Sequence, residues 1–124
     1  MRKESKQSIS KIQRLIWVEC RRIKDKSVVD CYTCGAKNLM GSNKQLGHLW
    51  SKATLSAFLK YDLRVLEWQC FRCNINGGGM GADFYLKKWE ELGSKRMKQL
   101  QKDRQVSLKA MDWYINLLEE YKML

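Results

Sequence analysis

The chain contains no proline and no long run of apolar residues. Without proline, one usual marker of a domain boundary is missing, and neither an internal repeat nor a low-complexity linker takes its place. The apolar stretches fall far short of the roughly 20 residues that a membrane-spanning helix needs. We therefore expect one soluble, folded domain over residues 1–124, with no membrane partner.

A secretory signal is also lacking, because the basic start MRKESKQSISK is not followed by an apolar segment and a small-residue cleavage site. We expect a cytoplasmic protein. In a reducing compartment, closely spaced cysteine pairs are more often metal ligands or redox centres than structural disulfides. Metal binding is therefore the first interpretation of the five cysteines.

Acidic residues are too few to balance the basic ones: 24 Lys and Arg stand against 13 Asp and Glu, a formal net charge of +11. Such a charge attracts polyanions, and salt screens the attraction. Nucleic acid is the partner that we expect. The charge alone would also suit an anionic membrane surface or an acidic protein.

Helical periodicity is present at both ends of the chain. Apolar residues recur at three- and four-residue steps from Ser8 to about Lys24, with basic residues on the other faces. The same spacing returns from Asp83 onward, where Gly93 marks a break. We predict a basic helix within residues 1–26 and two or three helices toward the C-terminus.

Between these helices, short β-branched or alternating segments predict strands, and glycine and asparagine mark loops. Three strands and one short helix are expected, at residues 27–32, around His48, at 62–69 and between Lys52 and Leu59. This pattern predicts an α+β fold with a core at 27–93 and a helical extension at 94–124.

Two Cys-x-x-Cys pairs, Cys31 with Cys34 and Cys70 with Cys73, are the strongest motif in the chain. The two-residue gap lets both sulfurs of a pair reach one ion from a single tight turn, and four thiolates complete a tetrahedron. We predict a structural zinc site, and iron also accepts four thiolates. Two disulfides, or a redox pair beside an unrelated pair, are the alternatives. Cys20 lies on the apolar stripe of the first helix, so we leave it out of the site.

His48, the only histidine, lies between the two cysteine pairs. A neutral imidazole can take a proton from water near neutral pH and so produce a nucleophile that attacks a phosphodiester. Asn74 directly follows the last cysteine, where its amide oxygen can hold a hard cation such as Mg²⁺ beside the phosphate. A lone histidine is usually incidental, so the spacing alone leaves both interpretations open.

The run CYTCG, then Gly47-His48, then QCFRCN and a glycine-rich turn, resembles in order and spacing the NinG (Rap) recombination proteins of lambdoid phages. The resemblance covers roughly residues 12–93. More distantly, the same residues resemble the treble-clef branch of the HNH, or ββα-metal, nucleases, including the endonuclease VII type. The resemblance implies a treble-clef zinc core and a structure-directed DNA endonuclease that acts on branched recombination intermediates such as Holliday junctions. A phage-encoded chain would work in the cytoplasm of its bacterial host.

Carried over by position, the resemblance implies His48 as general base, Asn74 as ligand of a catalytic Mg²⁺ or Mn²⁺, and the four paired cysteines as zinc ligands. The chain departs from the pattern at Gly47, where many HNH motifs have Asp, and at Val65, where the pattern often has Asn. Asp62 is a candidate for the missing carboxylate; alternatively it caps a turn or pairs with the nearby Arg64.

Basic residues within and after the core are candidates for phosphate contacts, which add salt sensitivity without sequence selectivity. The candidates are Lys44, Lys52, Arg64, Arg72, Lys87 and Lys88. Resolving a junction takes two symmetric cuts, so we expect a homodimer, and an apolar stripe from Leu108 to Leu118 packs either on the core or on a second subunit. The alternatives to a nuclease are a non-catalytic zinc-stapled DNA-binding module and an adaptor for an acidic protein.

Overall fold

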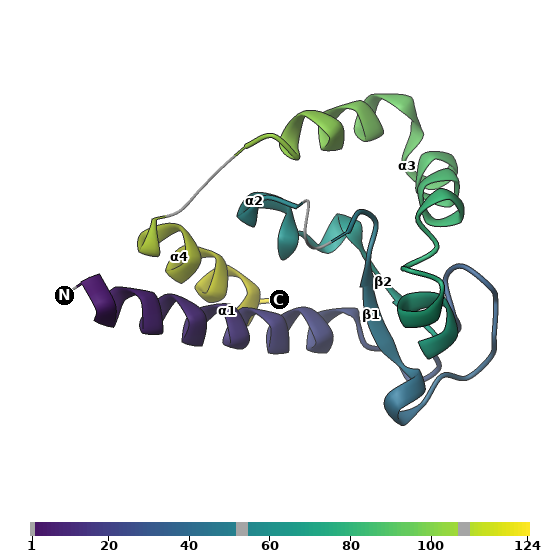
Figure 1. The fold of residues 1–124 in the computed structure, drawn as a ribbon, viewed down its shortest axis with the longest axis horizontal. Coiled ribbons are helices and arrows are strands. Elements are labelled where there is room, and N and C mark those ends of the chain that lie inside the picture. Colours follow the sequence, from purple (N-terminus) through teal and green to yellow (C-terminus); the bar gives the residue numbers. More distant parts are fainter. Residues whose placement is uncertain (1, 52–54, 107–109) are drawn as a thin grey trace. The chain divides into compact units, whose positions relative to one another are not determined.

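The computed structural model describes residues 2–51, 55–106 and 110–124 (Figure 1). The chain divides by packing into two compact units, Met1–Asp25 with Leu108–Leu124, and Lys26–Ser107. Helices occur together with a two-stranded antiparallel sheet, which confirms the predicted α+β class. The division of one domain into segments 1–26, 27–93 and 94–124 stays a prediction.

Two helices pack against each other in the first unit: α1 (Arg2–Lys24) and α4 (Met111–Lys122). The predicted N-terminal helix is therefore confirmed. Its apolar stripe is buried at the centre, where Ile16 and Cys20 have no exposed surface. Arg22 donates hydrogen bonds of 3.0 and 3.3 Å to backbone carbonyl groups at the C-terminal end of α4. A cation at that end of a helix also interacts favourably with the helix dipole.

The buried face of α4 differs from the predicted apolar stripe. Tyr114, Leu118 and Tyr121 are the buried residues, spaced as one helical face. Ile115, predicted to be in the stripe, is 39% exposed, and Leu108 lies outside the described residues. The two tyrosines bury large rings, so the helix is turned toward them and away from the smaller aliphatic side chain.

The second unit contains the sheet, in which β1 (Gln45–His48) runs antiparallel to β2 (Leu66–Gln69) with His48 opposite Leu66. The predicted strands around His48 and within 62–69 are confirmed, although Leu63–Val65 forms a 3₁₀ turn before β2. The sheet lies in a buried core that includes Leu46, Leu49, Leu59, Val65, Leu66, Trp68 and Phe84.

The predicted strand at 27–32 is wrong, because this segment forms no ladder. Its backbone groups instead close a turn and attach that turn to the sheet. The N–H of Cys31 donates to the carbonyl of Ala36 at 2.8 Å, and the N–H of Tyr32 donates to the carbonyl of Trp68 at 2.8 Å. The partners of these backbone groups therefore depend on the cysteine turn and on the distant β2 strand.

A short helix lies where one was expected, and α2 covers Ala57–Lys60. The beginning of the predicted segment, residues 52–54, lies outside the described residues. Among the helices that the structure describes, none combines the length and the apolar character that a membrane span requires.

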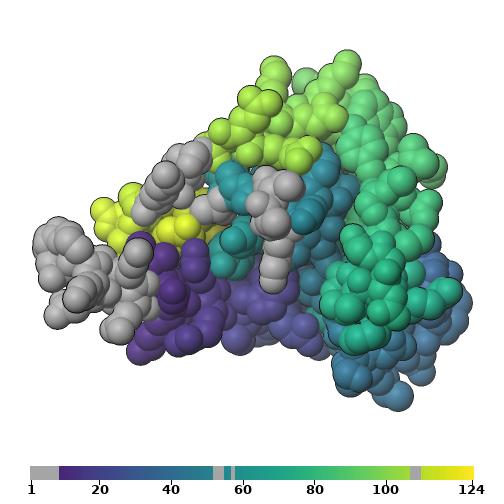
Figure 2. All heavy atoms as spheres, viewed as in Figure 1, coloured from purple at the N-terminus to yellow at the C-terminus, as the bar shows by residue number. Residues whose placement is uncertain are grey.

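Helix α3 (Gly81–Asp103) changes direction at Gly93, which has φ 83° and ψ 165° (Figure 1). The predicted break is confirmed. The two halves are linked across it, because Gln101 donates a hydrogen bond of 2.6 Å to the hydroxyl of Tyr85. Leu100 is completely buried, and the outer side of the second half lies at the surface shown in Figure 2.

Replacing Gly93 by Ala should lower the free energy of unfolding by about 1–3 kcal/mol, since its backbone conformation is nearly closed to residues with a Cβ. Chemical denaturation measures the difference. Gly81→Ala is the matched control: the φ of Gly81 lies outside the left-handed region, and no atom lies within 4 Å of an added Cβ. That variant should be as stable as the parent or slightly more stable, and equal losses for both would contradict the assignment.

Candidate metal centre

The first cysteine pair lies in a tight turn between residues 31 and 36. The N–H of Gly35 donates to the carbonyl of Cys31 at 2.9 Å, and Gly35 has the left-handed φ of 78° that favours glycine. The N–H of Cys34 points toward the sulfur of Cys31 at 3.5 Å. Both side chains therefore project from the same side of one turn, as the spacing predicts.

The second pair begins where β2 ends. Cys70 follows the strand directly, and Cys73 lies in a π-helical turn, Arg72–Asn76. The N–H of Cys73 points toward the sulfur of Cys70 at 3.4 Å, and the N–H of Asn74 donates to the carbonyl of Cys70 at 2.9 Å. The turn thus repeats the arrangement of the first pair and fixes Asn74 beside the sulfurs.

The four sulfur atoms, from Cys31, Cys34, Cys70 and Cys73, all lie within 4.8 Å of one another. The sulfurs of Cys34 and Cys70 are 3.7 Å apart, whereas a disulfide bond measures about 2.05 Å. A tetrahedron with zinc–sulfur bonds of about 2.3 Å has edges of about 3.8 Å. The cluster can hold a metal ion, and its geometry is compatible with structural zinc.

The cluster cannot carry four negative charges without a cation. Burial opposes ionisation of Cys31, but hydrogen bonds from the backbone of Cys70 and Cys34 outweigh it and lower the pKa of Cys31 to about 6. Burial, reinforced by the neighbouring thiols, raises the pKa of Cys73 to about 12. A divalent ion among the sulfurs would favour the thiolate of every ligand.

His48 is the last residue of β1 and is half buried. Its Nε2 donates a hydrogen bond of 3.0 Å to the backbone carbonyl of Lys60, at the end of α2. A carbonyl oxygen only accepts, so this contact puts the proton on Nε2 and leaves the basic lone pair of the neutral ring on Nδ1. This hydrogen bond orients the imidazole ring.

A relay of side-chain amides orients Asn74. Gln45 donates from Nε2 to the carbonyl of Ser42 at 2.9 Å, so its Oε1 accepts from Nδ2 of Asn74 at 2.8 Å. The Oδ1 of Asn74 then faces Gly47, a later residue of the same strand, and lies 3.0 Å from the position of a Cβ on Gly47. Gly47 precedes His48, so the amide oxygen of Asn74 lies beside the strand that carries His48.

Asp62 has the second of its two predicted roles. Its Oδ1 accepts hydrogen bonds from the backbone N–H and the Nε of Arg64, both at 2.9 Å, and its Oδ2 accepts from Nη2 at 2.6 Å. Arg64 also pairs with Asp103 at 3.2 Å. The hydrogen bond to Asp62 is the main cause that raises the pKa of Arg64. The carboxylate therefore caps a turn and pairs with arginine, as the alternative prediction for Asp62 states.

Lys87 and Lys88, predicted to contact phosphates, are used inside the fold. The ammonium of Lys87 donates to the carbonyl of Tyr32 at 2.7 Å and lies over the ring of the same tyrosine. Lys88 is only 4% exposed and forms an ion pair with Glu67 on β2. Lys88 therefore offers no accessible charge to a phosphate, and its prediction as a nucleic-acid contact is corrected.

Two further predicted contacts also have partners in the chain. Lys44 lies over the ring of Trp68, 5.0 Å from its centroid. Arg72 is exposed, and a hydrogen bond to the sulfur of Cys34 is the main cause that raises its pKa. Lys52 lies outside the described residues. Apart from the buried Lys88, the phosphate contacts stay predictions, although Lys44, Arg64, Arg72 and Lys87 also have partners within the chain.

Basic residues without ion-pair partners lie close together on the second half of α3. They are exposed and form no ion pair with the rest of the described chain; they are Lys95, Arg96, Lys98 and Lys102. The sequence places them in one basic stretch after Gly93, but it does not distinguish them from the lysines that are paired internally.

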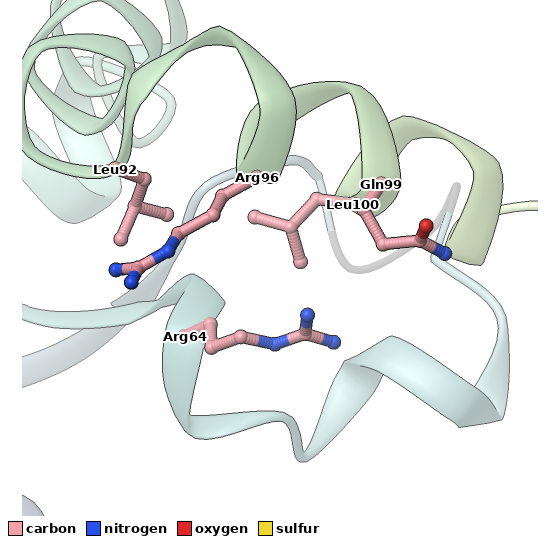
Figure 3. Close-up of a pocket in the computed structure, with 5 residues that line it drawn as sticks. All are labelled: Arg64, Leu92, Arg96, Gln99 and Leu100. Carbon is pink, nitrogen blue, oxygen red and sulfur yellow. The ribbon is translucent and has the colours of Figure 1, made fainter.

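A hollow of about 320 Å³ lies beside these cations, and Figure 3 shows the side chains that line it. The lining residues are Arg64, Leu92, Arg96, Gln99 and Leu100. Arg64 and Arg96 project from opposite walls of the hollow. Arg64 is paired with two carboxylates, so the available positive charge of the hollow comes from Arg96.

Gln69, at the end of β2, is completely buried and was not among the site residues predicted from the sequence. Its Nε2 donates to the hydroxyl of Thr33 at 3.0 Å and to the carbonyl of Gly79 at 2.9 Å. The side chain thereby joins the first cysteine turn to the glycine-rich turn. A glutamine at the end of a strand gives no signal in the sequence that separates this role from an ordinary exposed one.

The chain matches no protein-family model, and neither curated proteins nor solved structures give a significant match. The resemblance to NinG and HNH proteins therefore rests on the motifs themselves and stays a prediction.

Replacing Cys70 by Ser should abolish stoichiometric zinc binding and remove cooperative unfolding of the core, since a structural zinc contributes on the order of 10 kcal/mol to folding. Elemental analysis and circular dichroism melting measure the two effects. Cys20→Ala is the control and should keep one zinc per chain, because Cys20 is buried on α1. Retention of zinc by the first variant, or its loss from the second, would contradict the four-sulfur site.

Proposed function

We propose that the chain is a structure-directed, metal-dependent DNA endonuclease with a treble-clef core of the HNH (ββα-metal) type, similar to the NinG (Rap) recombination proteins. The observation that carries this proposal is the position of Asn74, whose amide oxygen lies beside Gly47, the residue before His48. The candidate oxygen ligand therefore lies beside the strand that carries the candidate general base. The short hairpin between two cysteine turns is the arrangement expected of a treble-clef core.

In the proposed reaction, Nδ1 of His48 takes a proton from a water molecule, and the resulting hydroxide attacks the phosphorus of the scissile phosphodiester. The bond from phosphorus to the leaving oxygen breaks, and that oxygen takes a proton from solvent. The carbonyl of Lys60 supports the step by holding the proton on Nε2. Asn74 Oδ1 would hold Mg²⁺ or Mn²⁺, which when bound stabilises the charge that develops on the phosphate oxygens. The zinc holds the fold and takes no part.

The cations on the second half of α3 are the surface that we assign to DNA. Lysine and arginine contacts to phosphates position a protein on DNA without reading its bases, which suits an enzyme that recognises a branch by its shape. A homodimer belongs to the proposal, because two copies of the site are needed for two symmetric cuts. The thiolate site also suits a reducing cytoplasm, that of the bacterial host for a phage-encoded chain.

A non-catalytic module that binds branched DNA is the second candidate. The observation that favours it is the pairing of Asp62 with Arg64, which leaves Asn74 without this carboxylate as a partner for a catalytic cation. The cysteines form the one group of at least three potential His, Cys, Asp or Glu ligands within the described parts of the chain. Such a module would bind junctions without cutting them.

Labelled four-way junctions incubated with the zinc-loaded protein and Mg²⁺ or Mn²⁺ should be cleaved. His48→Ala should reduce the rate by about 100-fold or more, the usual contribution of a general base, and Asn74→Ala should reduce it comparably. Asn76→Ala is the matched control on the same turn and should cut normally, since Asn76 is exposed. Binding without cleavage by the parent protein would favour the second candidate, and equal cleavage by His48→Ala would remove the histidine from the mechanism.

Replacing Lys98 or Lys102 by Ala should weaken junction binding and reduce the slope of log K against log salt by about 0.9 for each phosphate that the variant no longer neutralises. Fluorescence anisotropy at several salt concentrations measures the slope. Lys37→Ala removes one exposed charge that is already paired with Asp30 at 3.3 Å, so its slope should not change. Identical slopes for all three variants would exclude α3 as the DNA-binding surface.

A further inference from the structure

The hollow of about 320 Å³ between α3 and the turn that carries Arg64 has no part in the proposed reaction. Leu92 and Leu100 extend from α3 toward that turn and form the apolar part of its lining (Figure 3). Sites for small ligands in proteins have volumes of about 300 to 1,000 Å³. The hollow is at the lower end of this range, which is the size of a site for one small ring system.

Hydrogen bonds join the two walls of the hollow. Asp103 accepts from Nε2 of Gln99 at 2.9 Å and from Nη2 of Arg64 at 3.2 Å. Asp62 is the second carboxylate partner of Arg64, so the charge of this arginine is balanced within the fold. Arg96 is exposed and forms no ion pair with the described residues. Its guanidinium is therefore the cation that the hollow can offer to a ligand.

Two leucines, one available guanidinium and one amide are a combination that suits a nucleobase. The faces of a base pack against aliphatic side chains, and arginine stacks its planar guanidinium on such faces. The edge of a base forms hydrogen bonds, and Oε1 of Gln99 can accept one because its Nε2 is used by Asp103. A free phosphate suits the hollow less well, since burying a charge against leucines is costly unless hydrogen bonds compensate.

Exposed lysines lie next to the hollow on the same helix. Residues three or four positions apart are neighbours on a helix surface. Gln99 lines the hollow, and Lys95 and Lys102 lie four positions before it and three positions after it. Both lysines are exposed. A nucleotide whose base enters the hollow beside Gln99 would therefore have its phosphate close to these lysines.

We propose that the hollow binds one unpaired nucleobase of branched DNA, which stacks on Arg96 and is hydrogen-bonded at its edge by Gln99. This inference rests on the proposed function, in which α3 contacts DNA, and it identifies what the protein recognises in a branch. Every DNA has phosphates, so contacts to them alone do not select a branch. Taking a base out of a duplex costs stacking and pairing, and the cost is smallest for a base that is already unpaired.

The first test compares two DNA probes that differ in one base. Each is a duplex with a one-nucleotide bulge, and the bulged residue is either a deoxyadenosine or an abasic site, so the phosphates are the same. Fluorescence anisotropy with zinc-loaded protein, without Mg²⁺ or Mn²⁺, measures both affinities. The probe that carries the base should bind about 10-fold more tightly, a typical contribution of stacking one base. Equal affinities would overturn the proposal.

A second measurement locates the base without any substitution. The ring current of a base shifts the signals of protons packed on its face, so the methyl NMR signals of Leu92 and Leu100 should shift with the base-carrying probe. Leu86 is the control, because it is 61% exposed on the first half of α3, and its signals should respond equally to both probes. Inorganic phosphate alone should not move the signals of Leu92 and Leu100. Equal shifts with the abasic probe or with phosphate would identify an anion site and overturn the proposal.

A pair of variants separates stacking from charge. Arg96→Lys keeps the positive charge but removes the plane that stacks, so most of the difference between the two probes should disappear. Lys95→Ala is the matched control on the same helix: it should weaken binding of both probes and keep the ratio of their affinities. Both positions are exposed, and zinc content and melting temperature verify that the variants are folded. A ratio that survives Arg96→Lys, or that falls equally in Lys95→Ala, would overturn the proposal.

The result is separable from the outcome of the cleavage assay. A protein that prefers the base-carrying probe but cuts no junction retains the base site and loses the proposed catalysis. A protein that cuts junctions but binds both probes equally retains the catalysis and loses the base site.

Discussion

The meeting of four cysteine sulfurs within 4.8 Å of one another is the constraint on which the second unit depends. Cys34 and Cys70 are 36 residues apart, yet their sulfurs lie at 3.7 Å. Closing so long a loop costs conformational entropy, and a short chain has a limited core with which to offset it. The loop carries both strands and His48, and the turn that closes it carries Asn74. The contact between the two cysteine turns therefore determines where His48 and Asn74 lie.

The basic residues of this unit have two different roles: some form ion pairs within the fold, and others are exposed on its surface. Lys88 connects α3 to β2 through Glu67, and Arg64 holds the turn before β2 and the end of α3 through two carboxylates. Lys88 is buried, so breaking its ion pair would leave one charge uncompensated, which is strongly destabilising. Arg64 is partly exposed, so its two ion pairs contribute less. These cations are therefore structural. The exposed cations without an ion-pair partner in this unit include Lys95, Arg96, Lys98 and Lys102, which lie beyond Gly93 on α3.

The sequence predicted those features that depend on local spacing. The cysteine pairs, the strand at His48, the break at Gly93 and the first helix all follow from patterns of a few residues. The predicted strand at 27–32 failed because its partners are set by the cysteine turn and by Trp68, 36 residues beyond Tyr32. The strand propensity of a segment is a local property and does not reflect hydrogen-bond partners that are distant in the sequence.

The candidate site was predictable to the same extent. The sulfur ligands, His48 and Asn74 were identified from spacing and resemblance, whereas the amide relay through Gln45 and the burial of Gln69 depend on contacts between distant segments. Asp62 shows the limit most directly. A carboxylate near a motif has the same sequence signature whether it binds a metal or an arginine, and only the position of Arg64 decides between them.

The close approach of Gly47 to Gln69 also has an evolutionary consequence. The two positions share one volume, so a side chain at position 47 requires Gln69 to move or to be replaced by a shorter residue. Moving Gln69 would break its hydrogen bonds to Thr33 and Gly79. Substitutions at the two positions are therefore coupled by packing, although these positions lie on different strands and 22 positions apart in the sequence.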